Sequence, residues 1–350
     1  MKDIDNLVKA AVFFAHGGPE VLQIADVPVP EYGDNDVLIK VKAFALNRLD
    51  LWSRDGLPTL KLEFPHVGSS DFSGIVEEVG LKVTKFNKGD RVLVNAGISC
   101  RDCEMCNKGE HSLCNKFHLL GEHVWGGAAE FAVVPETNLM KFPTNIPFEE
   151  AAAIPLTLLT VYRMLVSKAK VKTGDTVLVI GAGGGIGTAA VQVAKANGAK
   201  VIAVTSSEEK ERVLKNIGAD HVVNYKENPD WGKAVYVLNG KQGVDITVDS
   251  TGEKVWEQAI RSLKKGGVLV NCGATSGYKG MTNLRLLFWN QITIYGSTMA
   301  NDTEFFEAMA LFVQGKVKPV IDKVYDFADI QKAHQRLESE DHIGKIVIRI

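Results

Sequence analysis

Four of the five cysteines of this 350-residue chain lie in one short stretch, SCRDCEMCNKGEHSLC. Thiols gathered in this way in a long chain are typical of metal ligands rather than of a disulfide framework. The spacing C-x2-C-x2-C also begins iron–sulfur runs, but the seven-residue gap that follows and the missing proline after the last cysteine favour zinc. Four thiolates fill the tetrahedral shell of Zn²⁺ and leave no position for a substrate. We therefore predict one structural zinc ion, held by Cys100, Cys103, Cys106 and Cys114.

A second chemical signature is the glycine-rich turn VIGAGGGIGTAA, which follows an apolar strand pattern and opens a helical one. The strict pattern G-x-G-x-x-G does not fit this turn. The alignment that we use is Ala182-x-Gly184-x-x-Gly187, in which alanine stands at the position of the first glycine. In this alignment Gly184 lets the backbone approach a pyrophosphate, and Gly187 lets helix and strand pack closely. The helix N-terminus then offers amide donors to the phosphates. The context predicts a dinucleotide site, and the alternative is a glycine-rich turn without a ligand.

The end of the next strand pattern bears on which nicotinamide cofactor binds. An NAD site usually places an acidic residue there to hold the ribose 2′-hydroxyl. Here the segment reads VTSSEEK, with Thr205 at that position. Ser206, Ser207 and Lys210 are suited to a 2′-phosphate, although either glutamate of the segment could reach a ribose. We favour NADP(H) over NAD(H).

The elements that must position these residues differ along the chain. The first 150 residues are β-rich, with β-branched runs at 36–46, 72–80 and 89–97. From about residue 155, strands alternate with helices, which predicts parallel βαβ units and a doubly wound α/β sheet. The predicted strands are 176–183, 200–205, HVVNY at 221–225, 244–250 and 266–273, the last containing Cys272 as a buried residue. The predicted helices are 187–199, 206–218 and one that runs through Val255, Ala259 and Leu263.

Local signals refine this pattern near its end. Ser206 and Glu209 fit a capping box that would start the helix 206–218. Two amphipathic helices follow, around 303–314 and 328–338, and the chain ends in the strand GKIVIRI.

Length and composition limit which class of protein this chain can be. At this length two domains are expected. The formal net charge of −2 offers no basic field for nucleic acid or an anionic membrane. We expect no signal peptide in MKDIDNLVKAAVFFAHGG, because charge interrupts its short apolar core, and no apolar run is long enough to span a bilayer. These features predict a cytoplasmic protein.

Several stretches resemble the medium-chain dehydrogenases/reductases, the superfamily of zinc-containing alcohol dehydrogenases and quinone oxidoreductases. They are GGPEVLQIADVPVPE, FNKGDRVLV, AAAIPLTLLTVYRML and AGGGIGTAAVQVAKANGA. The resemblance covers essentially the whole chain. It implies a GroES-like catalytic domain at 1–155 and 297–350 around a Rossmann coenzyme domain at 156–296. It also implies a homodimer or homotetramer, with ITIYGST as the edge strand of a dimer.

The resemblance breaks at the catalytic zinc of the alcohol dehydrogenases. Amide, hydroxyl and aliphatic side chains cannot replace thiolate and imidazole as zinc ligands, and the three ligand positions hold Asn47, Ser70 and Leu156. The proton-relay positions hold Leu49 and Trp52, whereas the carboxylates Asp50 and Asp71 are retained. These departures resemble the quinone oxidoreductase branch, which reduces quinones or activated C=C bonds with NADPH and no metal.

This chemistry needs no Lewis acid. Hydride addition to an enone or quinone places charge on a delocalised oxygen that one or two hydrogen-bond donors can stabilise. Asn47 is the candidate donor, and we group Asp50 with it as the candidate catalytic pair. One alternative is an alcohol or aldehyde dehydrogenase with a rearranged zinc site that uses Glu122 or His123. Another is a dinucleotide-binding sensor or structural protein with little catalysis.

The resemblance also implies cofactor contacts. Ile186 would pack against the nicotinamide with Thr160 beside it, the turn 273–275 would approach its amide, and Arg48 would reach the pyrophosphate. The full predicted cofactor set is Arg48, Thr160, Gly181, Gly184, Gly185, Ile186, Gly187, Thr205, Ser206, Ser207, Lys210, Gly273, Ala274 and Thr275. The predicted substrate is a small carbonyl compound or quinone.

Overall fold

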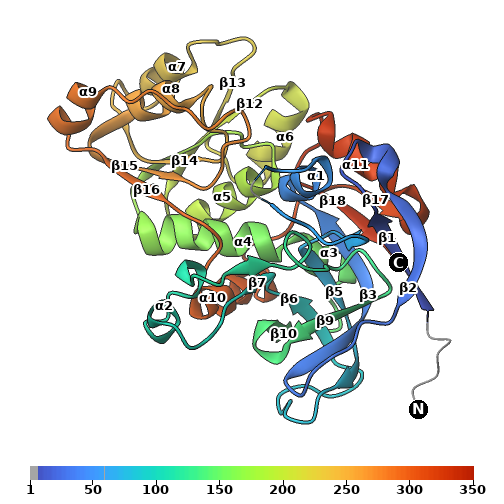
Figure 1. The fold of residues 1–350 in the computed structure, drawn as a ribbon. Helices are drawn as coiled ribbons and strands as arrows, with labels where there is room; N and C mark the ends of the chain where they lie inside the picture. Colours follow the sequence, from blue (N-terminus) through green and yellow to red (C-terminus); the bar gives the residue numbers. More distant parts are fainter. Residues whose placement is uncertain (1–6, 59) are drawn as a thin grey trace. The chain divides into compact units, whose positions relative to one another are not determined.

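The structure is a computed structural model, and it describes residues 7–58 and 60–350. Its chain groups into two compact units (Figure 1). The first holds residues up to Leu156 together with Asn301–Phe306 and Ile321–Ile350, and the second holds Thr157–Ala300 and Glu307–Val320. The sequence predicted residues 297–350 in the first domain, whereas 297–300 and 307–320 group with the second unit. The predicted fold class, a parallel Rossmann sheet plus a β-rich GroES-like domain, is confirmed.

The first unit is built mainly of antiparallel strands. Its largest sheet has the order β10-β6-β5-β3-β18-β17, with β9 also paired to β3, and smaller sheets are β2-β1-β4 and β7-β8. The strands are β1 (Leu7–Phe13), β2 (Gln23–Pro28), β3 (Asp36–Leu46), β4 (His66–Val67), β5 (Asp71–Val79), β6 (Arg91–Val94), β7 (Gly97–Ile98), β8 (His118–Leu119), β9 (Phe131–Pro135), β10 (Leu139–Lys141), β17 (Ile321–Asp326) and β18 (Lys345–Arg349).

The helices of this unit are short. They are α1 (Arg48–Asp55), α2 (Glu104–Asn107), α3 (Phe148–Ala153) and α11 (Ile330–Glu338), with 3₁₀ turns at Pro19–Val21, His111–Leu113, Glu136–Asn138 and Phe327–Asp329. The predicted helix 328–338 is therefore present as α11.

Strand β3 organises the first unit. Its sequence, DVLIKVKAFAL, is rich in β-branched and aromatic residues, and most of its side chains are buried. It pairs antiparallel with β5 on one side, where Ala45 faces Asp71, and with β18 on the other, where Leu46 faces Ile346. Because Asn47 directly follows β3, Asp71 begins β5 and Lys345 begins β18, the register brings three polar residues far apart in sequence to one end of the sheet.

The second unit is an open parallel sheet of order β13-β12-β11-β14-β15-β16. Its strands are β11 (Thr176–Val179), β12 (Lys200–Thr205), β13 (His221–Asn224), β14 (Val244–Asp249), β15 (Leu263–Asn271) and β16 (Thr293–Gly296). Its helices are α5 (Gly185–Ala196), α6 (Glu208–Asn216), α7 (Trp231–Leu238), α8 (Trp256–Arg261) and α9 (Leu284–Trp289). Two further helices cross the boundary between the units, namely α4 (Pro155–Tyr162), which runs on into a π-helical turn at Arg163–Lys168, and α10 (Asp302–Val313).

The strand sequences explain the parallel sheet. All four residues of β11, TVLV, are buried, as expected for a strand with helices on both faces. One core contains Trp231 and Ile260 together with Ile202 and Val204 of β12, Val244 of β14 and Leu269 of β15. The sheet order puts β16 at one edge, which agrees with the prediction for ITIYGST.

One predicted helix start is wrong by a residue. The cap of α6 is Ser207, not Ser206: the Ser207 hydroxyl accepts a hydrogen bond from the Lys210 backbone N–H at 3.3 Å. A cap residue keeps extended backbone angles, and Ser207 has them (φ −156°, ψ 156°). The chain therefore stays extended one residue longer than the sequence pattern predicted.

Within the described residues, no helix combines the length and apolar character needed to cross a bilayer.

The close packing of α5 on the turn before it gives a first prediction. A Cβ atom on Gly187 would lie 2.4 Å from the Ala182 Cα, whereas a Cβ on Gly184 would meet only the Gly181 carbonyl oxygen, at 3.7 Å. Gly187→Ala should therefore lower the free energy of unfolding by about 1–3 kcal/mol, the usual cost of overpacking. Gly184→Ala is the matched control and should leave it unchanged in urea denaturation. Equal stability of the two variants would contradict the proposed packing role.

Candidate active site and metal-binding loop

The buried carboxylate of Asp71 is the centre of a polar network in the first unit. One oxygen, Oδ2, accepts hydrogen bonds from Lys345 Nζ and from Asn47 Nδ2, each at 2.9 Å. The other, Oδ1, accepts the backbone N–H of Leu156 at 2.8 Å. Lys345 Nζ also donates to Asn47 Oδ1 at 2.5 Å. The structure thus brings together two of the three positions where zinc ligands were sought, 47 and 156, around a carboxylate and an ammonium group.

Lys345 was missed by the sequence analysis. Its side chain is 4% exposed and that of Asp71 is fully buried, so the pair is a buried salt bridge. A buried carboxylate requires a partner, and the retained Asp71 signalled that a cation was needed once zinc ligands were absent. The only local hint was a lysine at the start of the apolar strand GKIVIRI.

Asp50 lies beside this network and supports the backbone. Its Oδ2 accepts the Asn47 N–H at 2.7 Å, and its Oδ1 accepts the Ser69 N–H at 2.8 Å. The pKa of Asp50 is raised to about 7, and burial is the largest cause. The charge of Asp71 also raises it, whereas the two backbone hydrogen bonds and the charge of Lys345 lower it. Asp50 therefore fixes the turns that carry Asn47 and Ser69. Its place in the candidate catalytic pair stays a prediction.

The remaining candidate zinc ligands are occupied otherwise. The Ser70 hydroxyl donates to the Leu120 carbonyl at 2.6 Å. His123 Nδ1 accepts the Leu119 backbone N–H at 3.2 Å and lies 3.6 Å from Glu122 Oε2. Burial raises the pKa of the Glu122 carboxyl. Across residues 7–58 and 60–350, the four clustered cysteines are the only group of three or more His, Cys, Asp or Glu side chains that converge closely enough for a metal ion.

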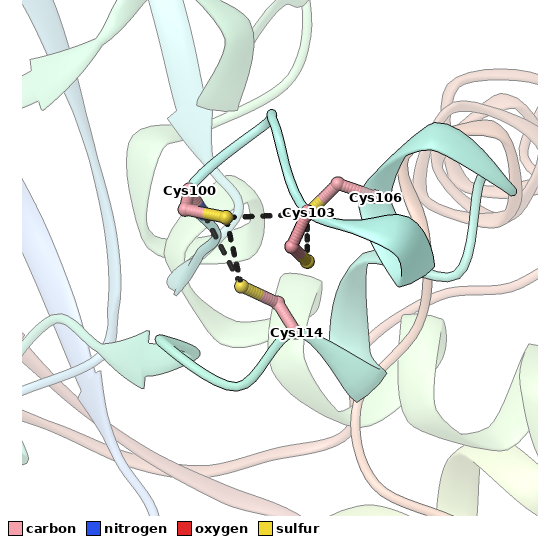
Figure 2. Close-up of side chains that lie close together, drawn as sticks. All are labelled: Cys100, Cys103, Cys106 and Cys114. Atoms are coloured by element: carbon pink, nitrogen blue, oxygen red, sulfur yellow. Dashed lines mark hydrogen bonds between the residues drawn. The ribbon is translucent and has the colours of Figure 1, made fainter.

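Those four cysteines point their sulfur atoms toward one another (Figure 2). Cys106 lies on α2, whereas Cys100, Cys103 and Cys114 lie in the surrounding loop. The Sγ atoms are separated by 3.9 Å for Cys100–Cys106, 3.5 Å for Cys103–Cys106 and 3.4 Å for Cys100–Cys114, and all four lie within 4.8 Å of one another. A tetrahedral zinc with Zn–S bonds of about 2.3 Å requires sulfur separations of about 3.8 Å. The thiols therefore fit a four-coordinate zinc ion.

Backbone amides around the loop favour thiolates. The N–H groups of Cys100 and Lys116 donate to the Cys114 sulfur at 3.4 and 3.3 Å. A backbone hydrogen bond from Cys106 lowers the pKa of Cys103 to about 6. Hydrogen bonds from backbone N–H groups to the sulfur atoms stabilise their negatively charged, metal-binding form.

The glycine-rich turn of the second unit leaves space where a phosphate would lie. Gly181 has a left-handed backbone (φ +63°), and Gly184 caps α5. The first N–H groups of α5, from Gly185, Ile186 and Gly187, have no carbonyl of their own helix to bond. With little around Gly184 to meet an added Cβ, the turn fits a dinucleotide pyrophosphate.

The tip of β12 carries the residues predicted to select the cofactor. Thr205 ends the strand, and its carbonyl accepts the Tyr225 N–H at 2.9 Å, which joins the tips of β12 and β13. The Lys210 side chain is mostly buried and crosses in front of Gly183, where an added Cβ would lie 2.8 Å from Lys210 Cδ. Ser206, Ser207 and Lys210 thus lie at the same edge of the sheet as the glycine turn. Tyr225 was predicted as the last residue of the strand HVVNY, but not as a neighbour of the cofactor-selecting residues, and β13 ends one residue before it.

The other predicted cofactor residues are placed as follows. Gly273 packs against Ser250, whose carbonyl lies 2.7 Å from where a Cβ of Gly273 would stand, and Thr275 Oγ1 donates to the same carbonyl at 3.4 Å. Thr160 is buried on α4. Arg48 forms an ion pair with Glu340. Their roles toward a cofactor stay predictions.

Two family models match the chain. The alcohol dehydrogenase GroES-like domain matches residues 33–144, and the zinc-binding dehydrogenase domain matches residues 185–314. A relative described as alcohol dehydrogenase, from Schizosaccharomyces pombe, is 32% identical over 97% of this chain and 97% of its own length. The human quinone oxidoreductase is 31% identical over 98% of each chain. The chain belongs to the medium-chain dehydrogenase/reductase superfamily, and it is an NAD(P)-dependent oxidoreductase.

Solved structures agree with this assignment. An NAD-dependent alcohol dehydrogenase is 46% identical, with a TM-score of 0.94, over 98% of this chain and 99% of that chain. The 2-octenoyl-CoA carboxylase reductase CinF, solved with NADP and 2-octenoyl-CoA, is 28% identical with a TM-score of 0.92, over 99% of this chain and 88% of that chain.

The raised pKa of Asp50 predicts a pH-dependent stability. Between the ordinary pKa of 3.8 and the folded-state value of about 7, the folded protein keeps a proton that the unfolded chain releases. Raising the pH through this window should therefore destabilise the wild type relative to Asp50→Asn. The relative change should reach at most about 4 kcal/mol, since one pKa unit corresponds to about 1.4 kcal/mol. Denaturant unfolding of both proteins at several pH values measures it, and parallel pH profiles would contradict the prediction.

Proposed function

We propose that this enzyme reduces quinones or α,β-unsaturated carbonyl compounds by direct hydride transfer from NADP(H), without a catalytic metal. The observation that carries this proposal is the Asp71–Lys345–Asn47 network. In it the carboxamide of Asn47, which stands at one of the three positions where the resemblance places a zinc ligand, bonds to the carboxylate of Asp71 and to the ammonium of Lys345. Lysine and asparagine side chains do not make the thiolate–imidazole shell that Zn²⁺ prefers.

The residues present suit a reaction that ends in a delocalised anion. A bound reduced nicotinamide supplies the hydride. The electrons displaced from the C=C bond move onto the carbonyl oxygen, and Asn47 donates an N–H to that oxygen. A preformed donor of this kind stabilises the enolate or phenolate. A proton from water then completes the saturated carbonyl or the hydroquinone.

The cofactor assignment rests on the tip of β12. Thr205 stands where NAD enzymes usually carry a carboxylate, and Ser206, Ser207 and Lys210 are donors suited to a 2′-phosphate. The NADP complex of the 28% identical CinF supports this assignment. The 46% identical solved structure is described as an NAD-dependent alcohol dehydrogenase, and NAD(H) is therefore the competing cofactor in the assay below.

We further propose that the cysteine loop holds one structural zinc ion per chain. The sulfur separations match a closed four-thiolate shell. The ion would tie α2 to the surrounding loop and contribute to stability rather than to turnover. Thiols that bind metal rather than form disulfides suit a reducing compartment, which supports a cytoplasmic location.

A second candidate function is alcohol or aldehyde dehydrogenation. The 46% identity to an NAD-dependent alcohol dehydrogenase favours it. Alkoxide formation from an unactivated alcohol needs a Lewis acid or a base, and Glu122 and His123 together offer only two ligands.

One experiment tests the proposal and this alternative. Purified protein is assayed for NADPH and NADH oxidation with a panel of quinones, enones and saturated aldehydes, and for NAD⁺ reduction with alcohols. We expect turnover of quinones or enones with higher kcat/KM for NADPH, and about one zinc per chain by elemental analysis, since the four-thiolate shell binds one ion. Two zinc ions per chain with alcohol turnover would overturn the proposal and support the second candidate. No turnover across the panel would also reject it.

We also propose that the protein self-associates through the edge of the second unit's sheet. Strand β16 lies at that edge. Helix α9, which precedes β16 in the chain, has three apolar side chains that are each about two-thirds exposed to solvent, Leu284, Phe288 and Trp289. Apolar residues clustered beside an unpaired edge are typical of an interface, and a second copy pairs such an edge symmetrically.

The association has its own test. Sedimentation of the wild type should give a dimer or tetramer. Phe288→Glu together with Trp289→Glu should lower the mass, because each places a charge in the contact. A monomeric wild type, or a variant with unchanged mass, would contradict an interface at this edge.

A further inference from the structure

We propose that Lys345 is a positioning residue that turns Asn47 into a directed and strengthened hydrogen-bond donor toward the substrate oxygen. This inference rests on the proposed function, because it assigns Asn47 to the oxygen that gains charge. It adds to the proposed site a residue that no sequence motif indicated, and it assigns a function to the buried Lys345–Asp71 ion pair.

The chemistry of the two neighbours fixes the orientation of the Asn47 carboxamide. The Lys345 ammonium only donates hydrogen bonds, so it holds the Oδ1 side of the amide, at 2.5 Å. The ionised Asp71 carboxylate only accepts, so it holds the Nδ2 side, at 2.9 Å. A flipped amide would place donor against donor and acceptor against acceptor. The Asn47 side chain therefore has one favoured orientation.

This arrangement leaves donor capacity on Asn47. Its Nδ2 carries two hydrogens, and Asp71 takes one of them. Lys345 cannot accept the other. The backbone of Asn47 is held as well, since its N–H donates to Asp50 at 2.7 Å. The second amide hydrogen is thus carried on a side chain and a backbone that are both fixed, as a preorganised donor requires.

Lys345 also strengthens that donor. A carboxamide whose oxygen accepts from an ammonium group shifts electron density toward the oxygen and makes its N–H hydrogens more positive. The chain from ammonium to amide to substrate oxygen lies in a buried environment, where such polarisation is little screened: Asn47, Asp71 and Lys345 are each less than 10% exposed. Because Asp71 balances the charge of Lys345, the effect passes mainly through Asn47 rather than directly from the ammonium.

A double-mutant cycle tests this route. Asn47→Ala should lower kcat about 100-fold, as loss of an oxyanion donor does. Lys345→Met should lower kcat about 10- to 100-fold through misorientation of the amide, with the dissociation constant for NADPH unchanged. The double variant should lose no more than Asn47→Ala alone. Lys345→Arg, which keeps a cationic donor, should recover part of the loss.

A matched control separates this role from general loss of an ion pair. Arg336 in α11 pairs with Asp322, Nε to Oδ2 at 3.0 Å, in the same unit. Arg336→Met should leave kcat unchanged. If Lys345→Met does not fold because Asp71 is left unpaired, Asp71→Asn combined with Lys345→Met removes both charges. This pair should show a loss in kcat of about 10- to 100-fold, as expected for Lys345→Met, because Asn47 is present but no longer oriented.

The outcomes are distinguishable from failure of the proposed function. Wild-type turnover on any quinone, enone or aldehyde supplies the assay, and its absence rejects the proposed function alone. In that case the side-chain amide resonances of Asn47, assigned in asparagine-labelled protein by comparison with Asn47→Ala, report the orientation. They should shift strongly in Lys345→Met and little in Arg336→Met. Unchanged kcat or unchanged resonances in Lys345→Met, or losses that multiply in the double variant, would overturn the inference.

Discussion

A carboxylate buried in the first unit's main sheet constrains the rest of the site. Asp71 is removed from water, and a charge in that position is stable only with a cation and with hydrogen bonds to both of its oxygens. Lys345, Asn47 and the Leu156 backbone meet that requirement. Loss of one partner of such a buried pair costs about 3–5 kcal/mol. The register of β3 with β5 and β18 brings these groups together, and the chemistry proposed for Asn47 depends on their interaction.

The sequence raised two questions about metal ions: whether the cysteine loop binds one, and whether one binds at the catalytic position. The two sites differ in how close together their residues lie in the chain. The cysteine loop draws all four of its ligands from one short segment, so its spacing could be read directly, and the structure brings the four sulfurs to separations suited to zinc. The catalytic position draws on segments far apart in the chain. There the sequence showed which ligands were missing, but not what takes their place. In the structure the Asp71–Lys345 ion pair and the Asn47 carboxamide lie there, and neither an ammonium nor a carboxamide is a good ligand for Zn²⁺.

Much of the fold was predictable because its signals are periodic and local. The strand at 36–46, the glycine turn before α5 and the edge position of ITIYGST agree with the structure. Lys345 was not predictable, because its pairing with Asn47 depends on β18 returning beside β3 across nearly 300 residues, and no local pattern encodes that register. The cap at Ser207 rather than Ser206 shows the same limit on a small scale, since two adjacent serines carry equal capping potential.

We propose that zinc binds this chain at the four thiolates and nowhere near Asp71. Anomalous diffraction at the zinc absorption edge, from crystals grown with zinc and cofactor, tests this proposal most directly. We expect a single strong peak per chain, surrounded by Cys100, Cys103, Cys106 and Cys114, with the Lys345–Asp71 ion pair intact. A second peak within bonding distance of Asp71, with Lys345 displaced, would contradict it.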